Sequence, residues 1–134
     1  MDRIELFKIN YNNTLSYIEN LSFYCTKVCS PRNLEFSKNG KFTYVICKNS
    51  SEVIILKYLG EEGFKLVQYI HVLPNGFGGQ NFGSAIKISP CNKSLIIANE
   101  KSDTLTIYFK NPDGTLKLLK NDIFIPSPTC IKFK

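Results

Sequence analysis

Short hydrophobic stretches separated by polar turns run through the whole chain. Between Pro31 and Tyr58, three such stretches follow one another at residues 34–36, 42–46 and 53–56. β-branched and aromatic residues between glycine, asparagine and serine breakers are typical of β-strands joined in hairpins. Nothing in the pattern reads as a helix of useful length, so the sequence predicts an all-β fold.

This strand pattern recurs along the chain. When the sequence is shifted by 52 residues it matches itself through four strands without a gap, from Ser37 on Ser89 to Leu66 on Leu118. Four-stranded units that recur at roughly 40–50 residues are typical of β-propeller blades. The repeat therefore predicts a partial β-propeller of about two to three blades of four-stranded antiparallel sheet.

Both ends of the chain repeat parts of the same unit. A shift of 49 residues places residues 4–9 on residues 53–58, so the chain begins with the third and fourth strands of a blade. Residues 127–133 repeat residues 30–36, the first strand of a blade. A single partial domain of residues 1–134 follows, divided into a half blade 1–20, a blade 31–70, a blade 84–120 and a closing strand 129–134.

Fewer than three blades cannot close a ring, and a closed ring is how a propeller protects its sheet edges. The first and last blades would each present an apolar face to solvent, and such faces promote association. Three outcomes are open: a poorly stable copy, assembly with itself or with a second propeller chain, and internal closure in which residues 130–133 join the hairpin 4–20.

Composition places the chain among globular proteins. Of its 134 residues, 43% are hydrophobic and 21% are charged. No run of about 18 apolar residues occurs, so we expect no membrane association. No secretory signal is visible, and an odd number of cysteines, five, favours reduced thiols in a cytoplasmic protein over a disulfide framework.

The formal net charge is +6, which has two interpretations. It can serve an anionic partner such as nucleic acid or a phosphorylated or carboxylated small molecule. It can equally be a dispersed basic surface. The lysines are spread along the chain, which favours the second interpretation, and we expect no nucleic-acid partner.

Residues with candidate chemistry are few. Cys25 and Cys29 lie four residues apart, but a metal would need two more ligands, and His71 is the only histidine. We therefore expect two partly buried thiols, no metal and no cofactor. His71 also lacks a motif that would place it in a Ser-His-Asp arrangement.

Residues 71–83 form the longest irregular stretch, with four glycines and a proline. Such a loop brings backbone groups close to a ligand. No helix follows to supply an N-terminal dipole for a phosphate, so a structural loop between blades is the alternative.

Four segments together resemble the seven-bladed propeller lactonase family, which includes bacterial 6-phosphogluconolactonase and the fungal carboxymuconate lactonising enzyme. They are residues 31–41, 73–81, 86–90 and 125–133. The resemblance covers nearly the whole chain but only a C-terminal part of the family's domain. It implies hydrolysis of a sugar-acid lactone, such as 6-phosphogluconolactone, and a small anionic lactone as partner.

The resemblance implies Arg32, Gln80 and Asn81 as substrate-binding residues. Arg32 can grip a carboxylate or phosphate in a bidentate manner, or it can tie one blade to the next. Asn81 can orient a lactone oxygen, or it can bond its own backbone.

Several positions depart from the family pattern. Cys47-Lys48 stands where the family has Asn-Glu, and Asn99-Glu100 stands where it has Asn-Arg. Ala85 stands where the family has a glutamate, and an alanine cannot transfer a proton. Asn33 stands where the family has a histidine. The catalytic residues are therefore unknown, and we expect activity to be weak or lost. The alternative function is a non-catalytic propeller fragment that assembles with itself or with another propeller chain.

Overall fold

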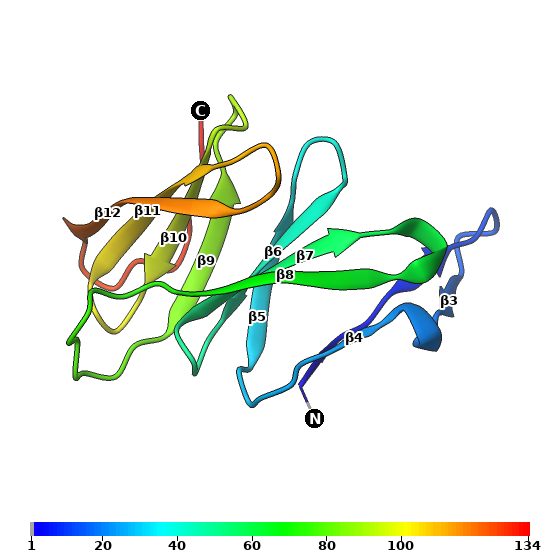
Figure 1. The fold of residues 1–134 in the computed structure, drawn as a ribbon, viewed down its shortest axis with the longest axis horizontal. Helices are drawn as coiled ribbons and strands as arrows, with labels where there is room; N and C mark the ends of the chain where they lie inside the picture. Colours follow the sequence, from blue (N-terminus) through cyan, green and yellow to red (C-terminus); the bar gives the residue numbers. More distant parts are fainter. Residues whose placement is uncertain (1) are drawn as a thin grey trace.

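Four antiparallel sheets make up the computed structural model, which describes residues 2–134 (Figure 1). The strands are β1 (Arg3–Ile4), β2 (Phe7–Ile9), β3 (Leu15–Tyr17), β4 (Phe23–Tyr24), β5 (Pro31–Phe36), β6 (Phe42–Cys47), β7 (Glu52–Tyr58), β8 (Phe64–His71), β9 (Gly83–Ile88), β10 (Ser94–Asn99), β11 (Thr104–Lys110) and β12 (Leu116–Phe124). Two short 3-10 turns, Glu19–Leu21 and Gly60–Glu62, interrupt them. The all-β partial propeller is confirmed.

Two four-stranded sheets form the body of the molecule. Their strand orders are β5-β6-β7-β8 and β9-β10-β11-β12, so strands that are neighbours in sequence are neighbours in space. Tyr44 pairs with Ile55 in the first blade, and Ile96 pairs with Ile107 in the second. The pairing register is thus preserved under the shift of 52 residues, and the sequence repeat is a repeat of structure.

A buried serine builds the same turn in both blades. The hydroxyl of Ser37 accepts a hydrogen bond from the Phe42 N–H at 3.0 Å, and the hydroxyl of Ser89 accepts one from the Ser94 N–H at 3.0 Å. Each serine therefore satisfies a backbone donor at the first turn of its blade, which explains why the repeat keeps it.

The N-terminal half blade is one hairpin with a break in its middle. β2 pairs with β3, and β1 pairs with β4 beyond the 3-10 turn Glu19–Leu21. Across the break the N–H of Leu6 donates to the Ser22 hydroxyl at 3.3 Å. The hairpin therefore reaches Tyr24, further than the expected half blade 1–20.

The expected closing strand 129–134 does not form. The last strand ends at Phe124, and the C-terminal segment 125–134 passes β9, where the hydroxyl of Ser84 donates to the Pro128 carbonyl at 2.6 Å. Residues 31–36, which this segment repeats, form β5 by pairing with β6. The described part of the chain offers the C-terminal segment no equivalent partner. Internal closure onto the hairpin 4–20 is likewise wrong, because no pairing joins the two.

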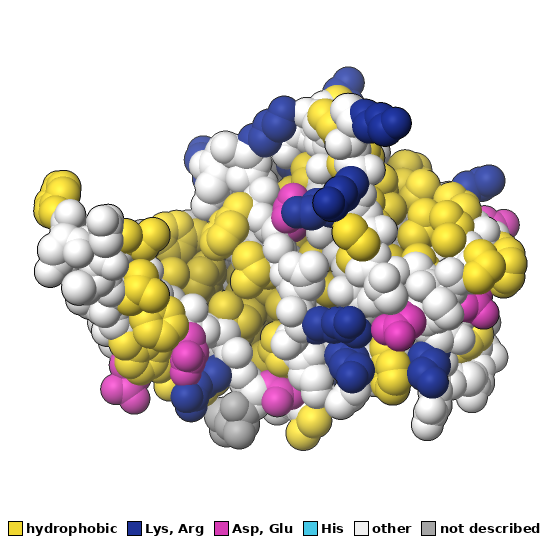
Figure 2. All heavy atoms as spheres, turned by 180° about the vertical axis from the view of Figure 1, so that it is seen from behind, with side chains coloured by type: hydrophobic (Ala, Val, Ile, Leu, Met, Phe, Trp, Pro, Cys, Tyr) yellow, Lys and Arg dark blue, Asp and Glu magenta, His cyan; other side chains and the backbone are white. Residues whose placement is uncertain are grey.

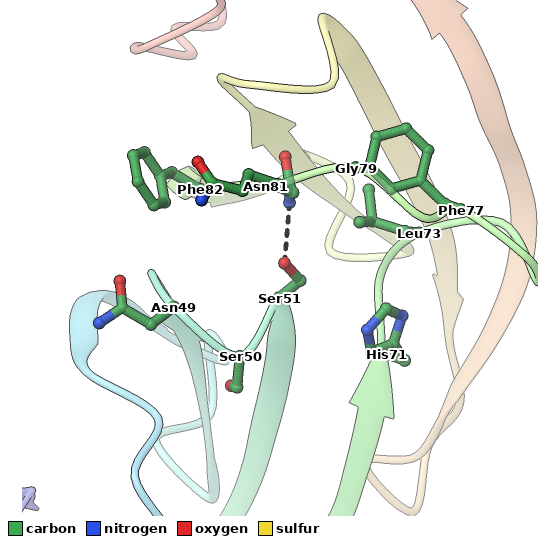
Figure 3. A pocket seen from close by; sticks show the side chains of 10 residues that line it. Asn49, Ser50, Ser51, His71, Leu73, Phe77, Gly79, Asn81 and Phe82 are labelled. Atoms are coloured by element: carbon green, nitrogen blue, oxygen red, sulfur yellow. Dashed lines mark hydrogen bonds between the residues drawn. The ribbon is translucent and has the colours of Figure 1, made fainter.

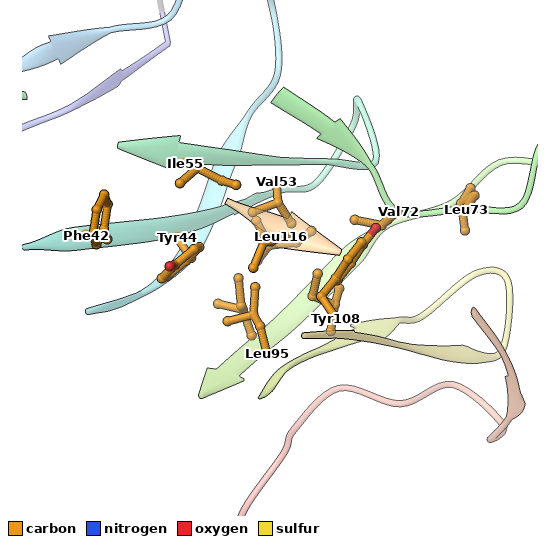
Figure 4. Close-up of a cluster of buried hydrophobic side chains, with 12 residues drawn as sticks. Phe42, Tyr44, Val53, Ile55, Val72, Leu73, Leu95, Tyr108 and Leu116 are labelled. Carbon is orange, nitrogen blue, oxygen red and sulfur yellow. The ribbon is translucent and has the colours of Figure 1, made fainter. Parts of the chain in front are cut away.

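Apolar side chains from both blades meet in one core, shown in Figure 4. Its fully buried members include Tyr44 and Ile55 from the first blade and Leu95 and Ile97 from the second. The hydroxyl of Tyr44 donates to the carbonyl of Gly114 at 3.0 Å, so a directional bond accompanies the apolar contact.

β9 approaches β6 closely at Gly83. A Cβ built on Gly83 would lie 2.4 Å from Cγ1 of Ile46 and 2.8 Å from the Cys47 carbonyl oxygen. Only glycine fits this contact between the blades.

A second core lies between the first blade and the N-terminal hairpin. It contains the thiol cluster, defined as Cys25, Cys29 and Cys47, all three free and buried. Burial raises the pKa of Cys25 and Cys29 to about 12 and that of Cys47 to about 11. Such thiols remain protonated at neutral pH and behave as small apolar side chains.

Figure 2 shows the back of the molecule, where hydrophobic side chains gather in the hollow beside the projecting N-terminal hairpin and Lys and Arg side chains are scattered over the rest. Within residues 2–134, no helix has the length and apolar character needed to cross a bilayer.

Candidate functional site

A pocket of about 420 Å³ opens where the loop between the blades meets the β6–β7 turn (Figure 3). It is lined by residues 49–51, by His71 and Leu73, and by Phe77 and residues 79–82 of the loop. The pocket therefore includes Gln80 and Asn81, two of the residues that the resemblance implied for substrate binding.

Local turn chemistry shapes the two walls. Ser51 adopts a left-handed φ of 53° and its carbonyl accepts the Val72 N–H at 2.9 Å, which joins the first wall to the end of β8. Gly76, with φ of 82°, sits in the turn closed by the Phe77 N–H and the Pro74 carbonyl at 3.2 Å. Gly76 is the third residue of this turn, where a positive φ favours glycine, so the local sequence helps to order the loop.

Asn81 is buried and ties three segments together. Its Nδ2 donates to the Ser51 hydroxyl at 3.2 Å and to Oδ1 of Asn99 at 3.4 Å, and its Oδ1 accepts from the Ser102 hydroxyl at 3.1 Å. Both ends of the amide are therefore engaged, and the side chain holds the pocket wall against the second blade.

Asn99 continues this polar network into the interface between the blades. Its Nδ2 donates to the hydroxyl of Thr106 at 2.9 Å, and that hydroxyl donates to the Val72 carbonyl at 2.8 Å. Both side chains are fully buried. A satisfied buried network of this kind is rigid, so the floor of the pocket is preorganised.

Arg32 lies away from this pocket. Its Nη1 is 3.4 Å from Oε2 of Glu100, on the turn that follows β10 in the neighbouring blade. Arg32 also lines a separate pocket of about 300 Å³ between β5 and β1. The structure thus brings Gln80 and Asn81 together and leaves Arg32 in a contact between blades.

The structure shows the surroundings of Ala85 and Asn33, two of the departures from the family pattern. Ala85 is 5% exposed and lies opposite Ala98 in the second blade, so no proton-transfer group occupies its place. The Oδ1 of Asn33 accepts the N–H of Leu34 at 2.8 Å, a local bond within β5.

Two functional candidates escaped the sequence argument. His71 lines the pocket although it belongs to no motif. Phe82 carries two ammonium groups near its ring, with Nζ of Lys48 at 4.8 Å and Nζ of Lys101 at 5.5 Å from the ring centroid. Both lysines follow the second strand of a blade, but no sequence signal shows that they meet at one ring.

Metal chemistry finds no support in the side chains. Across residues 2–134, no cluster of three or more His, Cys, Asp or Glu side chains is arranged to hold a metal ion.

Comparison with known proteins identifies the family. The family model described as lactonase, seven-bladed β-propeller, matches residues 1–120. The chain belongs to the seven-bladed β-propeller lactonase family.

Individual relatives match parts of the chain. An uncharacterised protein of Lactococcus lactis is 38% identical over 85 residues, which are 63% of this chain and 25% of that protein. The 6-phosphogluconolactonase of Bacillus subtilis is 30% identical over 82 residues, which are 60% of this chain and 24% of the enzyme. The chain thus spans about a quarter of these relatives' length.

A crystal structure of a Lactobacillus plantarum protein superimposes with a TM-score of 0.83. The match covers 90% of this chain and 35% of that protein at 24% identity, and it shows that the two share this fold.

Proposed function

We propose that this chain carries part of a lactonase site and hydrolyses the ester bond of a sugar-acid lactone of the 6-phosphogluconolactone type. The observation that carries the proposal is the pocket of about 420 Å³, with polar groups on both walls, in a chain of the lactonase family. A concave site with a few convergent polar groups on a rigid framework suits a small polar ligand.

His71 is the proton acceptor in this proposal. Among the residues that line the pocket, it is the one whose side chain commonly transfers protons near neutral pH. Water would attack the lactone carbonyl carbon and give its proton to the imidazole. The ring C–O bond would then break, and the departing oxygen would take the proton back to yield the open hydroxy acid.

Weak turnover is part of the proposal. Ala85 leaves no carboxylate where the family pattern has one, and Asn81 uses its amide to hold the wall together. A single imidazole would supply about 10²–10⁴-fold acceleration by general base catalysis alone.

The test is hydrolysis of 6-phosphogluconolactone by the purified chain, followed as acid release at pH 7 against the spontaneous rate. We expect a rate above background that is lost in His71→Gln. The matched control is Lys65→Gln, an exposed change on the same strand, β8. A wild-type rate equal to the spontaneous rate would exclude the proposal.

A non-catalytic role is the second candidate, favoured by the outer face of the second blade. Ile96, Leu105 and Ile107 lie there only half buried, and Phe109 is 38% exposed. In this alternative the face associates with a second copy or with another propeller chain. Light scattering on a sizing column would then give a discrete oligomer, whereas a stable monomer would count against it.

We also propose a cytoplasmic location. The five cysteines are all free, as expected for a chain kept in a reducing compartment. Labelling of thiols before and after cell lysis would test it, because oxidised cysteines in the cell would contradict a reducing compartment.

A further inference from the structure

A cationic cluster adjoins the pocket and shares a wall with it. The cluster consists of Lys48, Phe82 and Lys101. The two ammonium groups come from different blades, one from the turn after β6 and one from the turn after β10, and both lie over the same ring at 4.8 and 5.5 Å from its centroid. Phe82 itself lines the pocket. One aromatic ring therefore gathers two positive charges beside the pocket.

These charges are not balanced by their surroundings. The N–H of Glu100 donates to the Phe82 carbonyl at 2.9 Å, so a carboxylate is near, but that carboxylate pairs with Arg32 at 3.4 Å. The carboxylate of Asp103 accepts the Ser127 N–H at 2.7 Å and is engaged with the C-terminal segment. Within residues 2–134 neither lysine of the cluster forms an ion pair.

We propose that the cluster of Lys48, Phe82 and Lys101 binds the phosphate monoester group of a sugar-acid ligand. A phosphate monoester carries a charge of about −1.5 to −2 at neutral pH, which matches two free ammonium groups, whereas a carboxylate is matched by one. Charge-assisted hydrogen bonds from ammonium to phosphate oxygen are the stronger kind. The ring contacts keep both lysines over the site, so less side-chain entropy is lost on binding.

The position of the cluster fits a ligand with a polar body and a charged end. Asn49, which lines the pocket, is the chain neighbour of Lys48, and Phe82 borders both regions. A sugar-acid body would lie in the pocket while its phosphate reached the lysines. The inference deepens the proposed function and rests on it for the identity of the ligand body.

The test is calorimetric titration of the 134-residue chain with 6-phosphogluconate and with gluconate, two probes that differ by the phosphate. We expect 6-phosphogluconate to bind roughly tenfold more tightly, and the difference to shrink as salt rises from 50 to 200 mM, because screening weakens exposed charge pairs. Lys48→Gln and Lys101→Gln should each weaken 6-phosphogluconate binding by roughly five- to tenfold and leave gluconate binding unchanged.

Two further variants distinguish binding at a defined site from nonspecific attraction to a basic surface. Lys117→Gln removes an exposed charge on β12, away from the pocket residues, and should not change either affinity. Phe82→Leu keeps both charges but removes the ring that gathers them, and should weaken 6-phosphogluconate binding as well. The urea midpoint of each variant checks its folding.

Three results would overturn the inference: no heat of binding, equal affinity for both probes, or an equal loss in Lys117→Gln. Because binding of a reaction product is measured, the outcome is independent of turnover. A chain that binds 6-phosphogluconate but does not hydrolyse the lactone would refute the proposed function and leave this site standing. A chain that hydrolyses an unphosphorylated lactone but binds 6-phosphogluconate and gluconate equally would support the proposed function and refute this site.

Discussion

Replacing Gly83 by alanine tests the close approach of the two blades directly. The added Cβ would lie 2.4 Å from Cγ1 of Ile46 and 2.7 Å from its Cδ1, and also 2.8 Å from the backbone oxygen of Cys47. A rotamer change can relieve the first two contacts, but the third requires β9 and β6 to separate. Overpacking of this kind costs about 1–3 kcal/mol. For a chain of this length that corresponds to a fall in Tm of roughly 3–12 °C.

Urea unfolding followed by circular dichroism measures this cost. The matched control is Gly78→Ala, because a Cβ there meets nothing within 4 Å and its φ lies outside the left-handed region. That change should be neutral or stabilising by a few tenths of a kcal/mol, through the unfolded chain. The double variant Gly83→Ala with Ile46→Ala should recover part of the loss relative to the sum of the single changes. Equal midpoints for Gly83→Ala and Gly78→Ala would refute the packing argument.

Three further predictions concern stability. Tyr44→Phe should cost about 1–2 kcal/mol in urea unfolding, because the buried carbonyl of Gly114 loses its hydrogen-bond donor; an unchanged midpoint would contradict this. Burial raises the pKa of the three thiols of the cluster to about 11 or 12 from 9.0, so above pH 9 the unfolded chain loses these protons before the folded chain does. The free energy of unfolding should therefore be level below pH 9 and fall from pH 9 to 11. Urea midpoints across that range should fall less steeply for Cys47→Ala. The carboxylate of Asp2 accepts the N–H of Ser30 at 2.6 Å, and this bond helps to lower the pKa of Asp2. Acid below about pH 4 should therefore protonate Asp2 and loosen the N-terminal hairpin first. Asp2→Asn should speed hydrogen exchange of the Ser30 amide at pH 7 and leave the exchange of β10 amides unchanged.

The blades were predictable because their information is local. Each apolar strand of a blade finds its pairing strand within one hairpin. The turns begun by Ser37 and Ser89 likewise bond to backbone N–H groups of the same hairpin. The register between β6 and β7 therefore follows from the sequence repeat alone. The C-terminal residues 127–133 repeat a strand just as clearly, yet they form none, because a strand also requires a partner that its own residues do not supply.

The site was less predictable because it is assembled from distant segments. Gln80 and Asn81 were expected to bind substrate, but the role of Asn81 depends on Ser51 and Ser102, which belong to turns in different blades. The same holds for Lys48 and Lys101, which are far apart in sequence and meet at Phe82. No local pattern records which turns face one another across two blades.

Sheet order also has a kinetic consequence. Every strand pair of the two blades joins elements adjacent in sequence, so each sheet closes only short loops as it forms. Proteins dominated by such local contacts fold faster than sandwiches that pair distant strands. Each blade can therefore assemble as a separate early unit, and docking of the two, through Gly83 and the buried amides of Asn81 and Asn99, becomes the late step. Pulse-labelled hydrogen exchange should then detect protection of the hairpin amides before protection of the amides around the pocket.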